Sequence, residues 1–444
     1  MEEAPENTTV FPDDSRPLWK RGYLLKLNFI TLSMVLFSSA NGYDGSIMGG
    51  LLALPYWNQF MHHPSGAYLG WIPAIYWIGN FIGFPIAAWV ANRYGRKIGI
   101  YLGFSFLLLG VVMQTAAQNE ATFTYSRLFI GFASAWLGNA APLLINEIAH
   151  PKKRSIANAR FMVGWYFGGT LCSWVVFACR DIASDWCWRI PVLIQITLPV
   201  MALPGFVMAP ESPRWLISVG RVEQATEILS TQHAGGNKND PLVHEIQAAI
   251  NEKKEACTNA SYADMFKTPG NRHRLFISVT LGVFSQWAGN GIVSYYLPLI
   301  LNSIGITSTT YQTLISSCLN VWNLLWDIAA ATSVDKLGRR FLFLTSASIM
   351  LVSFIVITGL STTFAQTESA VFGLVVIPFL FIIFTGYDIA MTPFLTAYPC
   401  EIWSFTQRSR GLTVTWCSSV VALFLNTFAN AIALEAIQWR YYFV

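Results

Sequence analysis

An aspartate at the end of the first long apolar stretch is the residue of this chain best suited to proton chemistry. Residues 27–40 contain no charged side chain, and Asp44 follows within 41–46, Asn-Gly-Tyr-Asp-Gly-Ser. A carboxylate inside a membrane-spanning helix costs about 2.5–3.5 kcal/mol on insertion scales, so it usually has a partner or a task. We predict that Asp44 carries a proton that drives a solute across the membrane. The alternative is a helix-end acid close to the outer headgroups.

The residue pattern indicates no other kind of chemistry. The sequence contains no HExxH, GxSxG or P-loop motif. Its seven cysteines form no CxxC pair or metal-ligand cluster, so we interpret most of them as small apolar core residues. Cys179 and Cys187 flank one outer loop, and we expect them to be unbridged. We therefore predict neither an enzyme nor a metal or cofactor site.

The composition is that of a membrane protein. Hydrophobic residues make up 54% of the 444 and charged residues 12%, whereas soluble domains carry about 25% charge. The net charge of +4 does not indicate a nucleic-acid partner, because the basic residues lie in short loops between apolar segments. The start of the chain, 1–16, lacks the pattern of a signal peptide. An all-α polytopic protein in a lipid bilayer is the expected class.

Apolar segments long enough to cross a bilayer, about 20 residues each, recur along the chain. Six precede a polar stretch and five follow it, near 24–47, 69–91, 98–118, 122–146, 157–179, 190–209, 273–301, 311–334, 341–361, 370–398 and 411–434. This predicts four parts: a cytosolic N-terminal segment at 1–23, a transmembrane bundle at 24–209, a cytosolic loop with short helices at 210–272, and a second bundle at 273–444.

Basic residues are concentrated in alternate loops, and this asymmetry predicts the orientation. Cytosolic loops of membrane proteins carry an excess of Lys and Arg. The loops at 92–97 and 335–340 are rich in both, whereas the loops on the other side hold few. The N-terminus and the central loop are therefore predicted to be cytosolic.

An internal repeat relates the two bundles. The loop at 92–97, Asn-Arg-Tyr-Gly-Arg-Lys, corresponds to 335–340, Asp-Lys-Leu-Gly-Arg-Arg. After the fourth span Glu147 precedes Arg154 by seven residues, and after the tenth span Glu401 precedes Arg408 by seven residues. Two parallel halves of six spans are typical of carriers that rock one half against the other. The sequence ends where a twelfth span would begin, so we expect that helix to be missing from this chain.

With these motifs, the chain resembles the sugar-porter family of the major facilitator superfamily over essentially its whole length. Residues 210–216, Pro-Glu-Ser-Pro-Arg-Trp-Leu, match the family signature letter for letter. Local sequences at 42–45, 54–57 and 286–291 are similar to fungal hexose and lactose-type permeases. The resemblance implies a major facilitator fold and carbohydrate transport by alternating access. It also implies a monomer in the plasma membrane, with a sugar as substrate and protons as its expected partner.

The resemblance assigns roles to charged residues at the cytosolic span ends. They would form latches that hold the outward-open state and separate when the inside opens. These residues are Arg93, Arg96, Glu147 and Glu211 in the first half, and Arg339, Arg340, Glu401 and Arg408 in the second. Asn92 departs from the family, which usually has Asp there, so the first latch is expected to be weakened.

The resemblance also assigns a solute path. The sugar would be bound by Gln286, Asn290, Asn323, Thr396 and Asn426, and the outer gate would be closed by Tyr295 and Tyr296. Glycines and a proline in the span at 273–301 would loosen it, as a gate helix requires. Asn290 lies one residue before the family position, and Met162 replaces the usual amide of the fifth span. These departures leave a polyol carrier open as an alternative.

By the same resemblance, Asp44 would pair with Arg127 of the fourth span. Pairing favours the ionised acid and burial favours the neutral one, so changing solvent access can move the proton on and off. Asp327 and Asp388 are rival proton carriers, or polar contacts between helices. A proton-coupled sugar symporter is the leading prediction. A proton-independent facilitator and a nutrient sensor without turnover are the alternatives.

Overall fold

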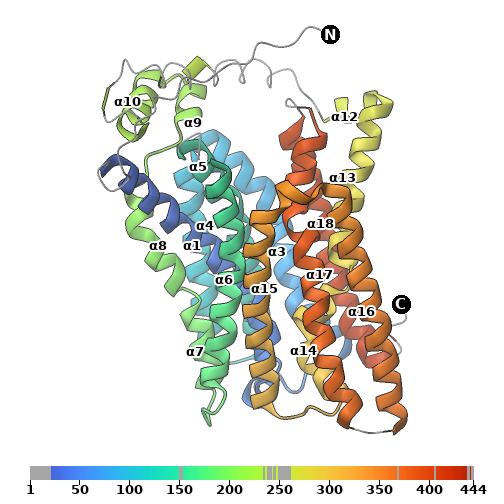
Figure 1. Cartoon of the computed structure of the whole chain (residues 1–444). Helices are drawn as coiled ribbons and strands as arrows, with labels where there is room; N and C mark the ends of the chain where they lie inside the picture. Colours follow the sequence, from blue (N-terminus) through green and yellow to red (C-terminus); the bar gives the residue numbers. More distant parts are fainter. Residues whose placement is uncertain are drawn as a thin grey trace.

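The computed structural model describes residues 22–149, 154–233, 236–237, 243, 247–248, 262–367, 370–404, 407–437 and 441. All regular structure within these ranges is helical, and the helices form two bundles side by side (Figure 1). The predicted N-terminal segment up to residue 21 and most of the central loop after residue 237 lie outside the described residues. The predicted all-helical class is confirmed.

The first bundle contains the helices of the N-terminal half. They are α1 (Gly22–Leu51), α2 (Pro55–Phe60), α3 (Gly66–Tyr94), α4 (Arg96–Thr115), α5 (Glu120–Ile148), α6 (Arg154–Cys179), α7 (Trp186–Ile194) and α8 (Thr197–Met208). The span predicted at 190–209 is divided into α7 and α8. Pro199 explains the division, because it has no backbone N–H to donate to residue 195. Cys179 and Cys187, beside the loop between α6 and α7, are free thiols.

The second bundle follows a group of short helices. The short ones are α9 (Pro213–Ser218), α10 (Val222–His233) and α12 (Asp264–Lys267). They lie at one end of the molecule, called the loop end below (Figure 1). The second bundle comprises α13 (Pro269–Trp287), α14 (Asn290–Ser303), α15 (Thr309–Leu337), α16 (Arg339–Thr367), α17 (Ala370–Ile402) and α18 (Arg408–Ile437). The absence of a twelfth helix stays a prediction, because residues 438–440 and 442–444 lie outside the described ranges.

The span predicted at 273–301 is interrupted twice. Gly289 has a φ of 88°, in the left-handed region that favours glycine, and it separates α13 from α14. Within α14, Tyr296 has non-helical angles of −123° and 22°, two residues before Pro298. The expectation that glycine and proline loosen this span is therefore confirmed.

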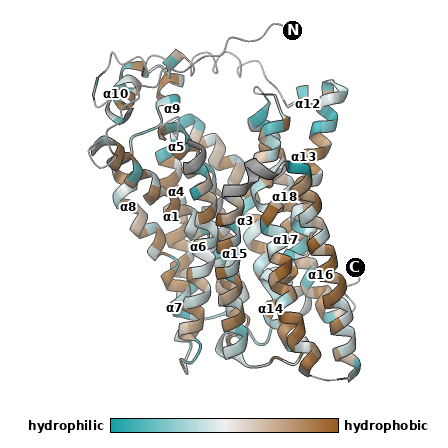
Figure 2. Ribbon diagram, viewed as in Figure 1, coloured by the Kyte–Doolittle hydropathy of each residue, from teal (hydrophilic) through white to brown (hydrophobic). Residues whose placement is uncertain are grey.

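The outer surface of both bundles suits a bilayer. By length and composition, nine helices in the described part of the chain can cross a membrane. Of the eleven predicted spans, the two that do not qualify are the interrupted pair α13–α14 and the polar helix α15. Hydrophobic residues run along α8 and α16, and hydrophilic residues gather on α10 and α12 (Figure 2). Trp89 is 62% exposed and Phe276 64%, which fits contact with lipid.

The two bundles contact each other at the end opposite the loop end. A Cβ on Gly49 of α1 would lie 2.6 Å from the carbonyl oxygen of Ser294 in α14. A Cβ on Gly70 of α3 would lie 2.6 Å from the carbonyl oxygen of Phe428 in α18. Both glycines therefore permit backbones of different bundles to approach closely.

Helices α1 and α6 of the first bundle pack backbone against backbone. A Cβ on Gly42 would lie 1.9 Å from the carbonyl oxygen of Trp165, and one on Gly168 would lie 1.8 Å from that of Ser39. Small residues allow this approach, and van der Waals packing then holds the two helices together. The contact fixes the stretch of α1 that carries Asp44.

We predict that Gly42→Ala destabilises the protein. The new methyl group would meet the Trp165 main chain, which cannot yield without separating α1 from α6. Overpacking of this kind costs roughly 1–3 kcal/mol. A thermal unfolding curve of the detergent-solubilised protein should show a lower midpoint.

Gly359→Ala is the matched control. This glycine lies inside α16, and no described atom comes within 4 Å of the position that its methyl group would take. Alanine there should be neutral or stabilising by about 0.4–1 kcal/mol. Equal midpoints for the two variants would contradict the packing account.

Candidate solute and proton site

Asp44 is a fully buried interior residue of α1. Its side chain is 0% exposed, and no described residue makes a hydrogen bond to either carboxylate oxygen. The neighbouring side chains join α1 to other helices, since Asn41 donates to the carbonyl oxygen of Ser134 at 3.3 Å and Tyr43 to that of Pro191 at 2.8 Å. The side chain therefore lies in the interior of the bundle, seven residues before the end of α1.

Arg127 of α5 lies beside Asp44 and is also buried, with 1% of its side chain exposed. Its Nη1 donates to the main-chain oxygen of Asp44 at 3.3 Å, and its guanidinium lies 4.9 Å from the centre of the Tyr76 ring. The structure thus brings the expected pair together through the main chain of Asp44. The carboxylate itself is left without a hydrogen-bond partner among the described residues.

Gln286, Asn290 and Asn426 surround the break between α13 and α14. The amide nitrogen of Gln286 donates to Ser419 Oγ at 2.9 Å, and Asn426 donates to the main-chain oxygen of Gln286. Asn290 begins α14, and its side-chain oxygen has no hydrogen-bond partner among the described residues. Tyr387 of α17 contacts the side chains of Asn290 and Gln286. The structure therefore brings amides of α13 and α14 to one aromatic hydroxyl, and an amide of α18 to the main chain of α13.

Asn323 and Thr396 lie on the adjacent helices α15 and α17. Asn323 is 5% exposed, and its side-chain oxygen is unpartnered among the described residues. Thr396 is half-buried. Trp322, next to Asn323, donates from Nε1 to Thr385 Oγ1 at 2.8 Å and so joins the two helices at this level. Of the predicted sugar contacts, Asn323 has the clearest capacity for a further hydrogen bond.

Tyr166 of α6 crosses from the first bundle to the second. Its hydroxyl donates to Asp388 Oδ1 at 2.7 Å and lies 2.8 Å from Thr392 Oγ1. Its neighbour Trp165 packs the other way, against Gly42 and Gly45 of α1. This polar contact was not predicted from the sequence. No signal in the sequence identifies it, because the partners lie more than 200 residues apart.

Tyr295 and Tyr296 occupy the irregular part of α14. The hydroxyl of Tyr296 donates to the carbonyl oxygen of Thr427 at 2.6 Å, and the side chain is fully buried. Tyr295 packs against the apolar cluster of the first bundle that includes Tyr76 and Trp77. Both tyrosines therefore pack against apolar clusters made mainly of first-bundle residues, and the hydroxyl of Tyr296 also bonds to the second bundle.

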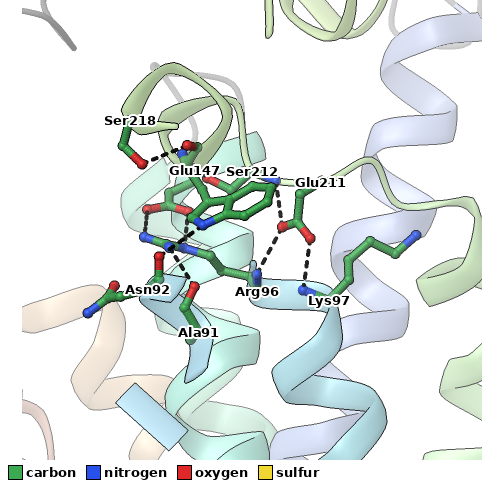
Figure 3. Close-up of polar contacts among 9 residues, drawn as sticks. Ala91, Asn92, Arg96, Lys97, Glu147, Glu211, Ser212 and Ser218 are labelled. Atoms are coloured by element: carbon green, nitrogen blue, oxygen red, sulfur yellow. Dashed lines mark hydrogen bonds and ion pairs between the residues drawn. The ribbon is translucent and has the colours of Figure 1, made fainter. Parts of the chain in front are cut away.

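A charged cluster joins α4, α5 and α9 at the loop end (Figure 3). Arg96 donates from Nε to Glu147 Oε2 at 3.0 Å and from Nη2 to Oε1 at 3.2 Å. The carboxylate of Glu211 accepts the main-chain N–H groups of Arg96 at 3.0 Å and Lys97 at 3.2 Å. These are free donors of the first turn of α4, where an anion is favourable. Arg93 is exposed and has no ion pair with a described residue.

Gly95 makes the approach of Glu211 possible. Its φ of 108° is in the region that favours glycine, and a Cβ there would lie 2.6 Å from Glu211 Oε2. The main-chain oxygen of Asn92 accepts Trp215 Nε1 at 3.0 Å, so the departure at position 92 leaves a main-chain contact in place.

The second bundle has a corresponding but more exposed ion pair. Arg339 donates to both oxygens of Glu401, at 3.2 and 2.9 Å. The side chains of this pair are 39% and 42% exposed, compared with 11% and 7% for Arg96 and Glu147. Arg340 and Arg408 are exposed nearby. The sequence repeat therefore places a bidentate Arg–Glu pair in each bundle. The pair of the first bundle is better shielded from water than that of the second.

Comparison with known proteins agrees with this arrangement. The model of a family described as sugar (and other) transporters matches residues 30–444. The chain is 27% identical to the MFS-type transporter oryC of Aspergillus oryzae, over 94% of this chain and 79% of that protein. It is 23% identical to a high-affinity glucose transporter of Kluyveromyces lactis, over 91% and 76%. The inward open structure of the xylose transporter XylE from E. coli superposes with a TM-score of 0.77, at 21% identity, covering 94% and 92%.

We predict that Gly95→Ala destabilises the protein more than Gly338→Ala. Both glycines have positive φ, 108° and 80°, so both alanines carry a backbone cost of about 1–2 kcal/mol. At Gly95 alone the methyl group would also displace Glu211, since no described atom lies within 4 Å of that position at Gly338. Thermal unfolding midpoints of the two variants measure the difference.

A Glu211→Ala background provides the control. Without the carboxylate, the extra cost at Gly95 should vanish and the two alanines should become equivalent. An undiminished difference in that background would show that Glu211 is not its cause.

Proposed function

The chain belongs to the family of sugar (and other) transporters, and we propose that it is a sugar–proton symporter that works by alternating access. The expectation of a multi-pass transporter rather than an enzyme is confirmed by this membership. Alternating access requires two bodies that move against each other around a central site. The two bundles are those bodies, and the close contacts between them at Gly49 and Gly70 mark a side that is closed in this state.

The observation that carries the proton part of the proposal is the unpaired, buried carboxylate of Asp44. A buried acid without hydrogen-bond partners favours its neutral form, and a nearby guanidinium favours the ionised form. Arg127 contacts the main chain of Asp44, so a guanidinium lies beside this acid. The structural relative XylE is described as a proton:xylose symporter, which supports the same assignment.

For the solute we propose a hexose or disaccharide. Gln286, Asn290, Asn323, Thr396 and Asn426 would bind its hydroxyl groups, and the free side-chain oxygens of Asn290 and Asn323 support this. The Kluyveromyces relative is named a glucose transporter, and one XylE structure holds 6-bromo-6-deoxy-D-glucose. Tyr295 and Tyr296 would close the gate at the end opposite the loop end.

The charged clusters at the loop end would hold the gate on that side. In the first bundle, the gate would be held by Arg96, Glu147 and Glu211. Arg93 would form an ion pair in another state of the carrier. Arg339 and Glu401 would serve the second, with Arg340 and Arg408 beside them. The proposal places the loop end in the cytosol and the protein, as a monomer, in the plasma membrane.

A proton-independent facilitator is the second candidate. The observation in its favour is that Arg127 contacts the main chain of Asp44 and not its carboxylate. An arginine that contacts only the main chain of α1 would not pair with the Asp44 carboxylate and release it during transport.

Asp44→Asn tests the proton part. The amide cannot carry the proton, so accumulation of labelled glucose or xylose against a gradient should be abolished in a transport-null host, while counterflow exchange persists. A protonophore should likewise reduce wild-type uptake to equilibration.

Asp181→Asn is the matched control, because Asp181 lies in an outer loop with its side chain 72% exposed. It should accumulate sugar as the wild type does. Intact accumulation by Asp44→Asn would move the proton to Asp327 or Asp388, and protonophore-insensitive accumulation would reject coupling.

A further inference from the structure

Two buried acids of the second bundle lie at one level on adjacent helices. Asp327 of α15 is 4% exposed and Asp388 of α17 is 0% exposed. The side chain of Trp322 hydrogen-bonds to Phe381 and Thr385 one to two turns before these acids, and both helices run in the same direction. The two carboxylates are close enough to interact electrostatically with each other.

The acids face the first bundle. Tyr166 donates to Asp388 Oδ1 from α6, and its neighbour in the next turn, Thr170, donates to the main-chain oxygen of Asn320 in α15 at 3.1 Å. Asp327 also interacts electrostatically with the Tyr166 hydroxyl. The pair therefore lies on the path between the two bundles, in the region of the predicted solute contacts.

Neither acid has a cationic side chain beside it in the described part of the chain. Asp327 Oδ2 and Asp388 Oδ2 have no hydrogen-bond partner among the described residues, and neither acid forms an ion pair with one of them. Asp44, in contrast, has the guanidinium of Arg127 beside it. Two buried carboxylates without a cation are costly, so such acids either hold a proton or are paired with a cation in the working protein.

The free atoms around the acids indicate what pairs with them. Asn323, one turn before Asp327 and 5% exposed, has a free side-chain oxygen, and so has Asn290. Asn290 contacts Tyr387, the residue next to Asp388. The unpartnered amide and acid atoms between α14, α15 and α17 are all acceptors. An ammonium group has three donors and no acceptor, and it carries the opposite charge.

We propose that Asp327 and Asp388 form a subsite for a cationic amino group, so that the solute class of this carrier is amino sugars or amino-polyols. The inference rests on the proposed sugar transport and narrows it. In this structure the Tyr166 hydroxyl donates to one of the acceptor atoms, Asp388 Oδ1. The ammonium of the solute takes the positions that Tyr166 leaves free, while Asn323 accepts a further hydrogen bond.

The test is a competition series at a pH where the amine is protonated. Binding to the purified full chain is followed by intrinsic tryptophan fluorescence and by thermal stabilisation. The ligands are glucosamine, glucose and N-acetylglucosamine, which compare a cation, its neutral parent and a neutral amide at one carbon atom. Glucosamine should bind about tenfold or more tightly than either neutral sugar, because charge-assisted hydrogen bonds in a buried site discriminate by this amount.

The variants Asp327→Asn and Asp388→Asn should each remove most of this preference, measured as the ratio of the glucosamine affinity to the glucose affinity of the same variant. Asp181→Asn, in the exposed outer loop, should keep the preference. If Asp388→Asn fails to fold, Asp327→Asn and Tyr166→Phe remain as tests; Tyr166→Phe frees Asp388 Oδ1 and should tighten binding of glucosamine.

The outcomes separate the inference from the proposed function. Equal binding of the three sugars overturns the inference and identifies the acids as protonated groups, and sugar transport stands. Preference for glucosamine that survives both aspartate substitutions also overturns it. Binding of glucosamine without any uptake of sugar supports the subsite and contradicts the proposed transport.

Discussion

The contact of α1 with α6 is the constraint on which the rest of the structure depends. Gly42 lets the main chain of Trp165 come so close that no side-chain atom fits between the helices. This approach fixes Asp44 inside the bundle, where Arg127 of α5 reaches its main chain. The next residue of α6, Tyr166, faces the other way and hydrogen-bonds to Asp388 of the second bundle. A single turn of α6 therefore connects the acid of the first half with an acid of the second.

This connection suggests how proton and solute sites can influence each other. A movement of α6 that releases Tyr166 from Asp388 would also change how Trp165 packs against Gly42 and Gly45 of α1, which lie within one turn of Asp44. Reciprocal coupling between two sites requires an element whose position both sites affect. Helix α6 is such an element, because Trp165 packs against α1 and Tyr166 bonds to Asp388. The charge clusters lie apart from it at the loop end, and the pair of Arg96 with Glu147 is better shielded from water than the pair of Arg339 with Glu401.

Much of the architecture could be predicted from the sequence, because long apolar segments and a repeated Gly-Arg loop determine spans and symmetry. The break at Gly289 was also predictable, since glycine and proline have local effects. The pairing partners of the acids were not. Asp44 was expected to pair through its carboxylate, yet Arg127 contacts its main chain, because rotamers depend on packing from several helices. The contact of Tyr166 with Asp388 and the cap of α4 by Glu211 join residues far apart in the chain, and no local pattern shows them.

The central claim is that Asp44 carries a proton together with the sugar. The most direct measurement is the proton flux evoked by sugar in proteoliposomes that contain the purified protein and a trapped pH indicator. Addition of a transported sugar to the wild type should acidify the lumen in step with labelled-sugar entry, and Asp44→Asn should admit sugar by exchange without any change of pH. Sugar entry into wild-type vesicles at constant luminal pH would contradict the account.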